Sequence, residues 1–233
     1  MWRTILMKYV PVLDKNFRPM YAEFKKYSAE VEKTENKTLK ICVERNDGYN
    51  YIYEYKIFAD AKHADENNRM AERLVKTILW LVGGYKIYLT GDKSVYEYIK
   101  AAYTDDGLRA FDKKFMERVY EKPFEVVLCD EKSFPKEKKC SLSVGGHLDG
   151  CRIGFDAGGS DRKVSAVVDG KVVYSEEVVW FPKINSDPDY HYNEILTAFR
   201  TAASKMPRVD AIGVSSAGVY VNNKIMVASL FLK

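Results

Sequence analysis

The sequence predicts an α/β protein made of two units. Three observations lead to this class. Strand-like and helix-like runs alternate along residues 1–130, a polar stretch follows at 131–150, and residues 151–233 carry a second alternating pattern around a glycine-rich block. We therefore expect an α/β domain of unassigned role at 1–130, a linker at 131–150 and a second α/β domain at 151–233.

The overall composition is that of an ordinary globular protein. Of the 233 residues, 46% are hydrophobic and 30% are charged, and the formal net charge is only +4. Lysines and glutamates are interspersed, which is typical of a solvated surface rather than of a nucleic-acid-binding stripe. The sequence therefore gives no clear indication of a nucleic-acid partner.

The cysteines and the apolar runs bear on the compartment. The N-terminal apolar run is broken by Lys8 and Pro11, which argues against a signal peptide, and the later run Leu74–Val82 is too short to cross a bilayer. The cysteines form no CxxC pair, so free thiols are favoured over disulfides or a zinc site; they are Cys42, Cys129, Cys140 and Cys151. We expect a cytoplasmic protein with no membrane partner.

The first domain begins with a helix and a hairpin. Residues 17–33 have helical spacing of apolar side chains, and the alternating runs 38–45 and 49–58 flank Asn46-Asp47-Gly48, a hairpin signal. The many tyrosines would suit a stacking platform for sugars or bases, but strand propensity and packing explain them as well. We favour packing.

The rest of the first domain alternates helices and strands. Residues 65–84 predict an amphipathic helix that ends at Gly83-Gly84 with a left-handed C-cap. After the first helix, the expected order is β-β-α-β-α-α-β, with its last four elements at 85–91, 93–103, 108–120 and 124–130.

The second domain begins with a predicted three-stranded meander. Its strands are expected at 151–157, 163–169 and 171–180, with Asp169-Gly170 at the second turn. A loop at 182–190, a helix at 191–206 and a buried strand that ends near Gly218 follow.

The first turn of this meander, Gly158-Gly159-Ser160-Asp161-Arg162, is richer in glycine than a hairpin requires. Glycines let backbone N–H groups approach an anion, and a serine hydroxyl adds a donor. Asp156 just before them would repel a bare phosphate, but a magnesium ion between them reconciles the charges. The alternative is an ordinary hairpin turn with no ligand.

The β-β-β-α-β order resembles the ribonuclease-H-like half-domain of actin-like ATPases, and residues 151–233 resemble the start of the ROK family of sugar kinases and regulators. The run GFDAGGS is similar to that family's phosphate motif Asp-x-Gly-Gly-Thr, and AIGVSSAGVYV to its later strand and turn. The resemblance implies ATP and Mg²⁺ as cofactors. It implies that Asp156 organises the metal, and that Gly158, Gly159 and Ser160 face the ATP phosphates.

The chain departs from the family pattern in two places. Ala217-Gly218 stands where proline-glycine is usual, and the gap between Ser160 and Asp169 is one residue longer, so Lys163 is not aligned. The family's catalytic aspartate, sugar-binding motif, zinc loop and adenosine motif have no counterpart here, so no catalytic residue is assigned.

These departures lead to two functional hypotheses. One is the N-terminal portion of a longer ATP-dependent sugar kinase, inactive alone, with its catalytic base outside this chain. The other is a non-catalytic nucleotide- or sugar-sensing regulator whose first domain is an interaction module. A half-domain would leave an apolar face uncovered, so we expect the chain either to self-associate or to bury that face against its first domain.

Overall fold

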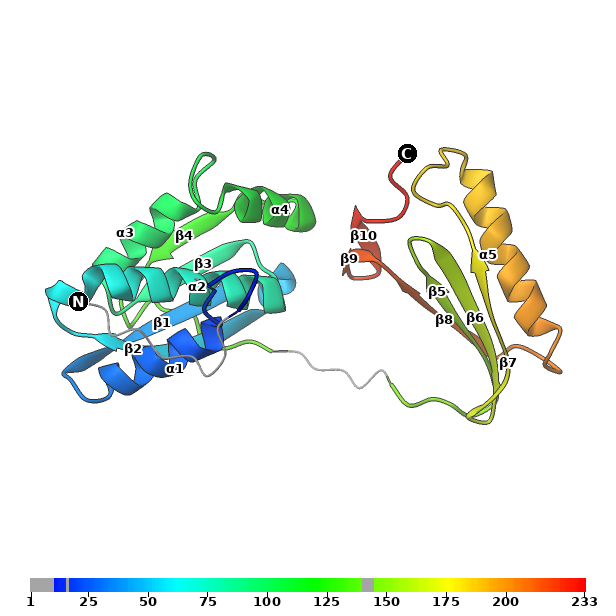
Figure 1. Ribbon diagram of the computed structural model, residues 1–233, viewed down its shortest axis with the longest axis horizontal. Coiled ribbons are helices and arrows are strands. Elements are labelled where there is room, and N and C mark those ends of the chain that lie inside the picture. The colour runs from blue at the N-terminus through cyan, green and yellow to red at the C-terminus, as the bar shows by residue number, and fades with distance from the viewer. Residues whose placement is uncertain (1–10, 16, 140–144) are drawn as a thin grey trace. The chain divides into compact units, whose positions relative to one another are not determined.

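The computed structural model describes residues 11–15, 17–139 and 145–233 (Figure 1). The N-terminal apolar run up to residue 10 and Cys140 lie outside them. The described residues up to Glu117, together with Lys122–Lys139, form one compact unit. Those from 145 onward, together with Arg118–Glu121, form the other. Both units combine helices with sheets, so the α/β class is confirmed.

The first unit is a four-stranded sheet with four helices. The sheet order is β2-β1-β3-β4, in which β1 is antiparallel to β2 and β3 while β3 is parallel to β4. The strands are β1 (Asn36–Glu44), β2 (Asn50–Phe58), β3 (Lys86–Thr90) and β4 (Glu125–Leu128). The helices are α1 (Met20–Val31), α2 (Ala64–Val82), α3 (Lys93–Ala102) and α4 (Ala110–Tyr120).

The local predictions for this unit are confirmed. The element order matches, and Asp47 and Gly48 adopt positive φ of 58° and 70° in the short 3-10 turn Asn46–Gly48 between β1 and β2. Helix α2 ends at Gly83 with φ 73°, and the Gly83 amide donates to the carbonyl of Leu79. Leu39, Ile41 and Val43 alternate along β1 and are fully buried.

The start of the expected linker belongs to the first unit instead. Lys40 of β1 pairs with Glu131 at 2.7 Å. The Asn50 side chain donates to the Lys136 carbonyl and accepts from the Lys138 amide, while its own amide donates to the Lys138 carbonyl. Residues up to Lys138 are therefore tied to the sheet of the first unit by hydrogen bonds and ion pairs, although most of them are exposed.

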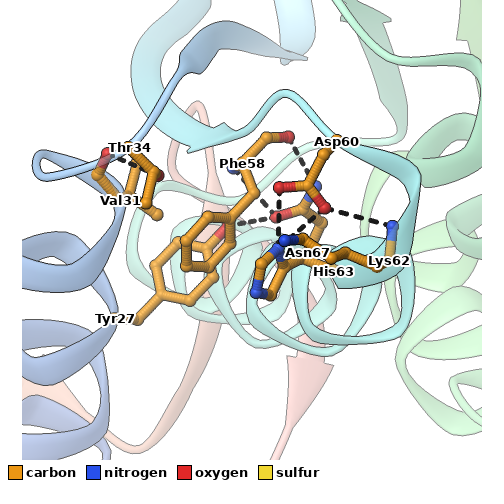
Figure 2. A network of polar contacts seen from close by, with 8 residues as sticks. All are labelled: Tyr27, Val31, Thr34, Phe58, Asp60, Lys62, His63 and Asn67. Atoms are coloured by element: carbon orange, nitrogen blue, oxygen red, sulfur yellow. Dashed lines mark hydrogen bonds and ion pairs between the residues drawn. The ribbon is translucent and has the colours of Figure 1, made fainter.

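A buried amide holds α1, β2 and α2 together. Asn67 of α2 accepts from the Tyr27 hydroxyl at 2.5 Å and from the Phe58 amide at 3.1 Å, and donates to the Phe58 carbonyl at 2.9 Å (Figure 2). Before α2, the Asp60 side chain accepts from the Lys62 amide and pairs with His63 in the short 3-10 turn Ala61–His63. Because β2 ends at Phe58, this network satisfies backbone groups that the ladder leaves open.

The second unit contains a four-stranded sheet in the order β7-β6-β5-β8. Strand β5 is antiparallel to β6 and parallel to β8, and β6 is antiparallel to β7. The strands are β5 (Cys151–Ala157), β6 (Asp161–Val168), β7 (Lys171–Val179) and β8 (Ala211–Ser216), with helix α5 (Pro188–Ala203) between β7 and β8. A separate hairpin follows, formed by β9 (Gly218–Val221) and β10 (Lys224–Ala228).

Helix α5 packs against one face of β5 and β6. The strand expected to be buried, β8, is instead largely exposed, so that prediction is wrong. Ile153 and Phe155 of β5 form a buried core with Ala198 and Ala202 of the helix and with Trp180. The meander is confirmed, including positive φ at the Asp169-Gly170 turn. The expected helix start at residue 191 is wrong, because Asp187 caps the Asp189 amide and Pro188 begins the first turn.

Two further expectations concern thiols and membranes. Cys42, Cys129 and Cys151 are free thiols, as predicted for the three described cysteines. None of the helices within the described ranges has both the length and the apolar character needed to cross a membrane.

We expect Asn67→Ala to destabilise the first unit by about 2 kcal/mol, because it leaves the buried backbone groups of Phe58 and the Tyr27 hydroxyl unpaired. Urea unfolding followed by circular dichroism measures this. Asn68→Ala is the matched control, since the buried Oδ1 of Asn68 has no hydrogen-bond partner among the described residues. Equal stabilities of the two variants would contradict a structural role for Asn67.

Limited trypsin digestion should first cut after Lys139. Lys139 is exposed, residues 145–149 are exposed, and the hydrogen bonds that fix the segment to β2 end at Lys138. Mass spectrometry of the early fragments identifies the site. Earlier cleavage at Lys76, inside α2, would contradict the division into two units.

Candidate functional site

The turn Gly158–Ser160 joins β5 to β6 and is held by Trp180. The Trp180 indole N–H donates to the Gly158 carbonyl at 2.8 Å, and its backbone amide donates to the Ser160 carbonyl at 3.1 Å. Trp180 itself is only 1% exposed. None of the hydrogen bonds in the described part of the chain is donated by the amides of Gly159 or Ser160. The carbonyls of Gly158 and Ser160 are thus fixed, while the amides of Gly159 and Ser160 lack an acceptor in the described part of the chain.

The two glycines of the turn are needed for different reasons. Neither has a positive φ. A Cβ on Gly158 would lie 2.4 Å from the backbone carbonyl oxygen of Asp161, so the hairpin itself excludes a side chain there. A Cβ on Gly159 would instead lie 2.9 Å from the Lys183 ammonium, at the end of a flexible side chain. Hairpin geometry therefore accounts for Gly158 and leaves Gly159 unexplained.

Asp156 lies near the end of β5, beside Ser215 of β8. The two residues are register partners in the parallel pair, and the Ser215 hydroxyl donates to the Asp156 carboxylate at 2.6 Å. Side chains alternate along a strand, so Asp156 points away from the face that α5 covers and is exposed. This open face forms a shallow groove lined by glycine, serine and valine residues and Phe155, together with Asp156 and Lys163.

A second acidic residue, Asp161, lies directly after the turn. Its carboxylate pairs with the Lys163 ammonium at 3.1 Å and accepts from the Ser160 hydroxyl at 3.1 Å. The Lys163 ammonium, helped by the Ser160 hydroxyl, holds the pKa of the Asp161 carboxyl below its usual range. Lys163 also approaches Glu177 at 3.8 Å. The positive charge of Lys163 is thus largely balanced by carboxylates.

The structure places the four predicted site residues along one short stretch, but not in one pocket. Asp156 lines the open groove, whereas Gly158–Ser160 lie beyond its end and do not line it. Three contributing residues, Ser215, Trp180 and Lys183, were missed from sequence. Parallel pairing of the predicted strands could have indicated Ser215. Trp180 and Lys183 contact the turn from more than nineteen residues away in sequence, and no local sequence pattern indicates such contacts.

The residues present fit a magnesium ion that arrives with phosphate rather than a resident metal. Groups of three or more His, Cys, Asp or Glu side chains able to enclose a metal are absent from the described residues. Magnesium bound with nucleotides needs only one or two carboxylates, since waters and phosphate oxygens complete its shell. Asp156 gives one contact to Ser215 and keeps acceptor capacity on its carboxylate for such a shell.

Comparisons with known proteins give weak likenesses. No protein-family model matches the chain, and no curated protein matches it. An exopolyphosphatase from Cytophaga hutchinsonii is 12% identical over 77% of this chain and 64% of its own, with a TM-score of 0.23. A Ppx/GppA phosphatase from Aquifex aeolicus, the type II variant, is 10% identical over 76% of this chain and 62% of its own, with a TM-score of 0.20.

The chain thus spans less than two thirds of the length of these solved structures. Likenesses at such TM-scores assign neither a family nor an activity to it. The resemblance to the ROK family stays a prediction from the motif.

We expect Gly158→Ala to destabilise the second unit by about 1–3 kcal/mol, because its Cβ must displace the Asp161 backbone. Gly159→Ala should fold nearly as well as the wild type, since only the flexible end of Lys183 must move. Thermal unfolding of both variants tests this difference. Equal losses would mean that the turn does not have the described geometry.

Proposed function

We propose that residues 151–233 form a ribonuclease-H-like half-domain of the actin-like ATPase type that binds the phosphates of ATP with Mg²⁺ at the β5–β6 turn. The observation that carries the proposal is the pairing of Asp156 with Ser215 beside a turn whose Gly159 and Ser160 amides have no acceptor among the described residues. A carboxylate and unpaired amides attract opposite charges, and a Mg²⁺-phosphate group presents both.

The strand order supports the fold part of this proposal. Three antiparallel strands are followed by a helix and by a fourth strand parallel to the first, in the spatial order β7-β6-β5-β8. This is the β-β-β-α-β arrangement expected of the half-domain. Ligands of open α/β sheets bind outside the carboxyl ends of parallel strands, and both β5 and β8 end beside this turn.

The roles follow from the chemistry of each group. The Asp156 carboxylate would hold the magnesium ion, either directly or through its waters, while Ser215 fixes the orientation of that carboxylate. The amides of Gly159 and Ser160 would donate to phosphate oxygens. Phosphoryl transfer depends mainly on such positioning and charge stabilisation.

We also propose a specific activity, that of a sugar kinase in which a sugar hydroxyl accepts the γ-phosphoryl group of ATP. The proposed location is the cytoplasm. It is supported only by the similarity of residues 154–160 to the ROK phosphate motif. A nucleotide sensor without turnover uses the same turn and the same Asp156. Because the kinase hypothesis places the catalytic base outside this chain, the longer protein is needed to separate the two. Phosphorylation of a sugar by that protein supports the kinase, and ATP binding without turnover supports the sensor.

Asp156→Asn should weaken ATP binding about tenfold or more in the presence of Mg²⁺ and have little effect in EDTA, because the amide cannot hold the cation. Isothermal titration with ATP and with inorganic triphosphate measures both, and the second ligand isolates phosphate recognition from any adenosine contact. Asp149→Asn is the control, because it also removes a carboxylate, but one that is exposed and paired with Arg152. Equal affinities of wild type and Asp156→Asn with Mg²⁺ would contradict the proposed metal role.

A further inference from the structure

The side chain of Lys183 reaches the space that Gly159 leaves open. Lys183 lies in the loop between β7 and α5, more than twenty residues after the turn. Its Nζ and Cε lie 2.9 Å and 3.0 Å from the position that a Gly159 Cβ would occupy. The methyl group of Leu230, which is 2% exposed, lies 3.7 Å from the same point. The ammonium group therefore lies beside an apolar wall at the turn.

The loop that carries Lys183 is held on both sides. Trp180, at its start, makes the two hydrogen bonds to the turn described above. The Phe181 amide donates to the Tyr190 hydroxyl at 2.9 Å, and the Asn185 side chain donates to the Phe181 carbonyl at 2.8 Å. Residues on both sides of Lys183 are thus held by the core and by α5, while the Lys183 side chain itself is exposed.

The charge of Lys183 is available to a ligand. Lys163, the other lysine near the turn, pairs with Asp161 and approaches Glu177. Throughout the described ranges, no carboxylate lies within ion-pair distance of Lys183. Asp161 is the acidic residue next to the turn, and Lys163 balances it. Lys183 is exposed, and within the described residues neither its ammonium nor the Gly159 and Ser160 amides have a partner, so together these donors favour an anion.

We propose that the Lys183 ammonium and the amides of Gly159 and Ser160 form a subsite for one phosphoryl group. The ligand class is a phosphate oxyanion, either free or at the end of a di- or triphosphate. The identification of that ligand rests on the proposed function, whereas the subsite itself rests on the contacts of Lys183. On this inference, a side chain at Gly159 would displace the Lys183 ammonium from the subsite.

Lys183→Gln should weaken binding of inorganic triphosphate to the full chain about tenfold, because one charge-assisted contact is lost. Lys183→Arg should retain most of the affinity, and Lys171→Gln, at the opposite end of the β6–β7 hairpin, should leave it unchanged. Urea unfolding should give wild-type stability for Lys183→Gln, since its ammonium makes no ion pair within the described residues. Isothermal titration at two salt concentrations provides the affinities, and a weaker salt dependence is expected for Lys183→Gln.

The outcomes separate this inference from the proposed function. If Asp156→Asn loses Mg²⁺-dependent binding while Lys183→Gln binds normally, the subsite is wrong and the proposed function stands. If Lys183→Gln loses binding while Asp156→Asn does not, the subsite stands and the metal role is wrong. A loss with Lys163→Gln in place of Lys183→Gln would also overturn the subsite. If the wild-type chain binds neither triphosphate nor ATP, both proposals fail.

Discussion

The parallel pairing of β5 with β8 is the constraint on which the second unit depends. Parallel neighbours cannot be joined by a tight turn, so the chain must leave β7, form α5 and return on the far side of β5. The crossover helix then covers the face that carries Ile153 and Phe155. The same register places Asp156 opposite Ser215, so the strand pairing that the core requires also forms this polar pair.

Trp180 connects this core to the turn. Its side chain is buried with the core residues, yet its indole N–H donates to the Gly158 carbonyl. A buried indole N–H needs an acceptor, and here the turn supplies it. Packing of Trp180 in the core therefore fixes the backbone of Gly158–Ser160. Within the described residues, the amides of Gly159 and Ser160 donate no hydrogen bond. A turn held in this way does not need to be ordered by a ligand, so less affinity is lost on binding.

Local signals made much of the fold predictable, and long-range contacts made the rest inaccessible. The turns at Asp47-Gly48 and Asp169-Gly170 need positive φ, and the Asp-Gly pair indicates this because Asp and Gly tolerate such φ values better than most residues. Asn50 pairs with residues 136–138, which lie far from it in sequence. Because no local pattern indicates this pairing, the charged composition of residues 131–139 predicted a linker. The start of α5 was signalled by Asp187-Pro188, but the proline was interpreted as part of a loop.

The candidate site shows the same division. Asp156 and the glycine turn stand out from sequence because they are adjacent and unusual, while Ser215 and Lys183 are ordinary residues brought there by the fold. The two glycines make the distinction physical. An ordinary hairpin requires Gly158, because the Asp161 carbonyl occupies the space of a side chain, but it requires nothing of Gly159. At Gly159 the neighbouring atoms are a cation and an apolar wall. The fold does not require the second glycine, and the proposed phosphoryl subsite would account for it.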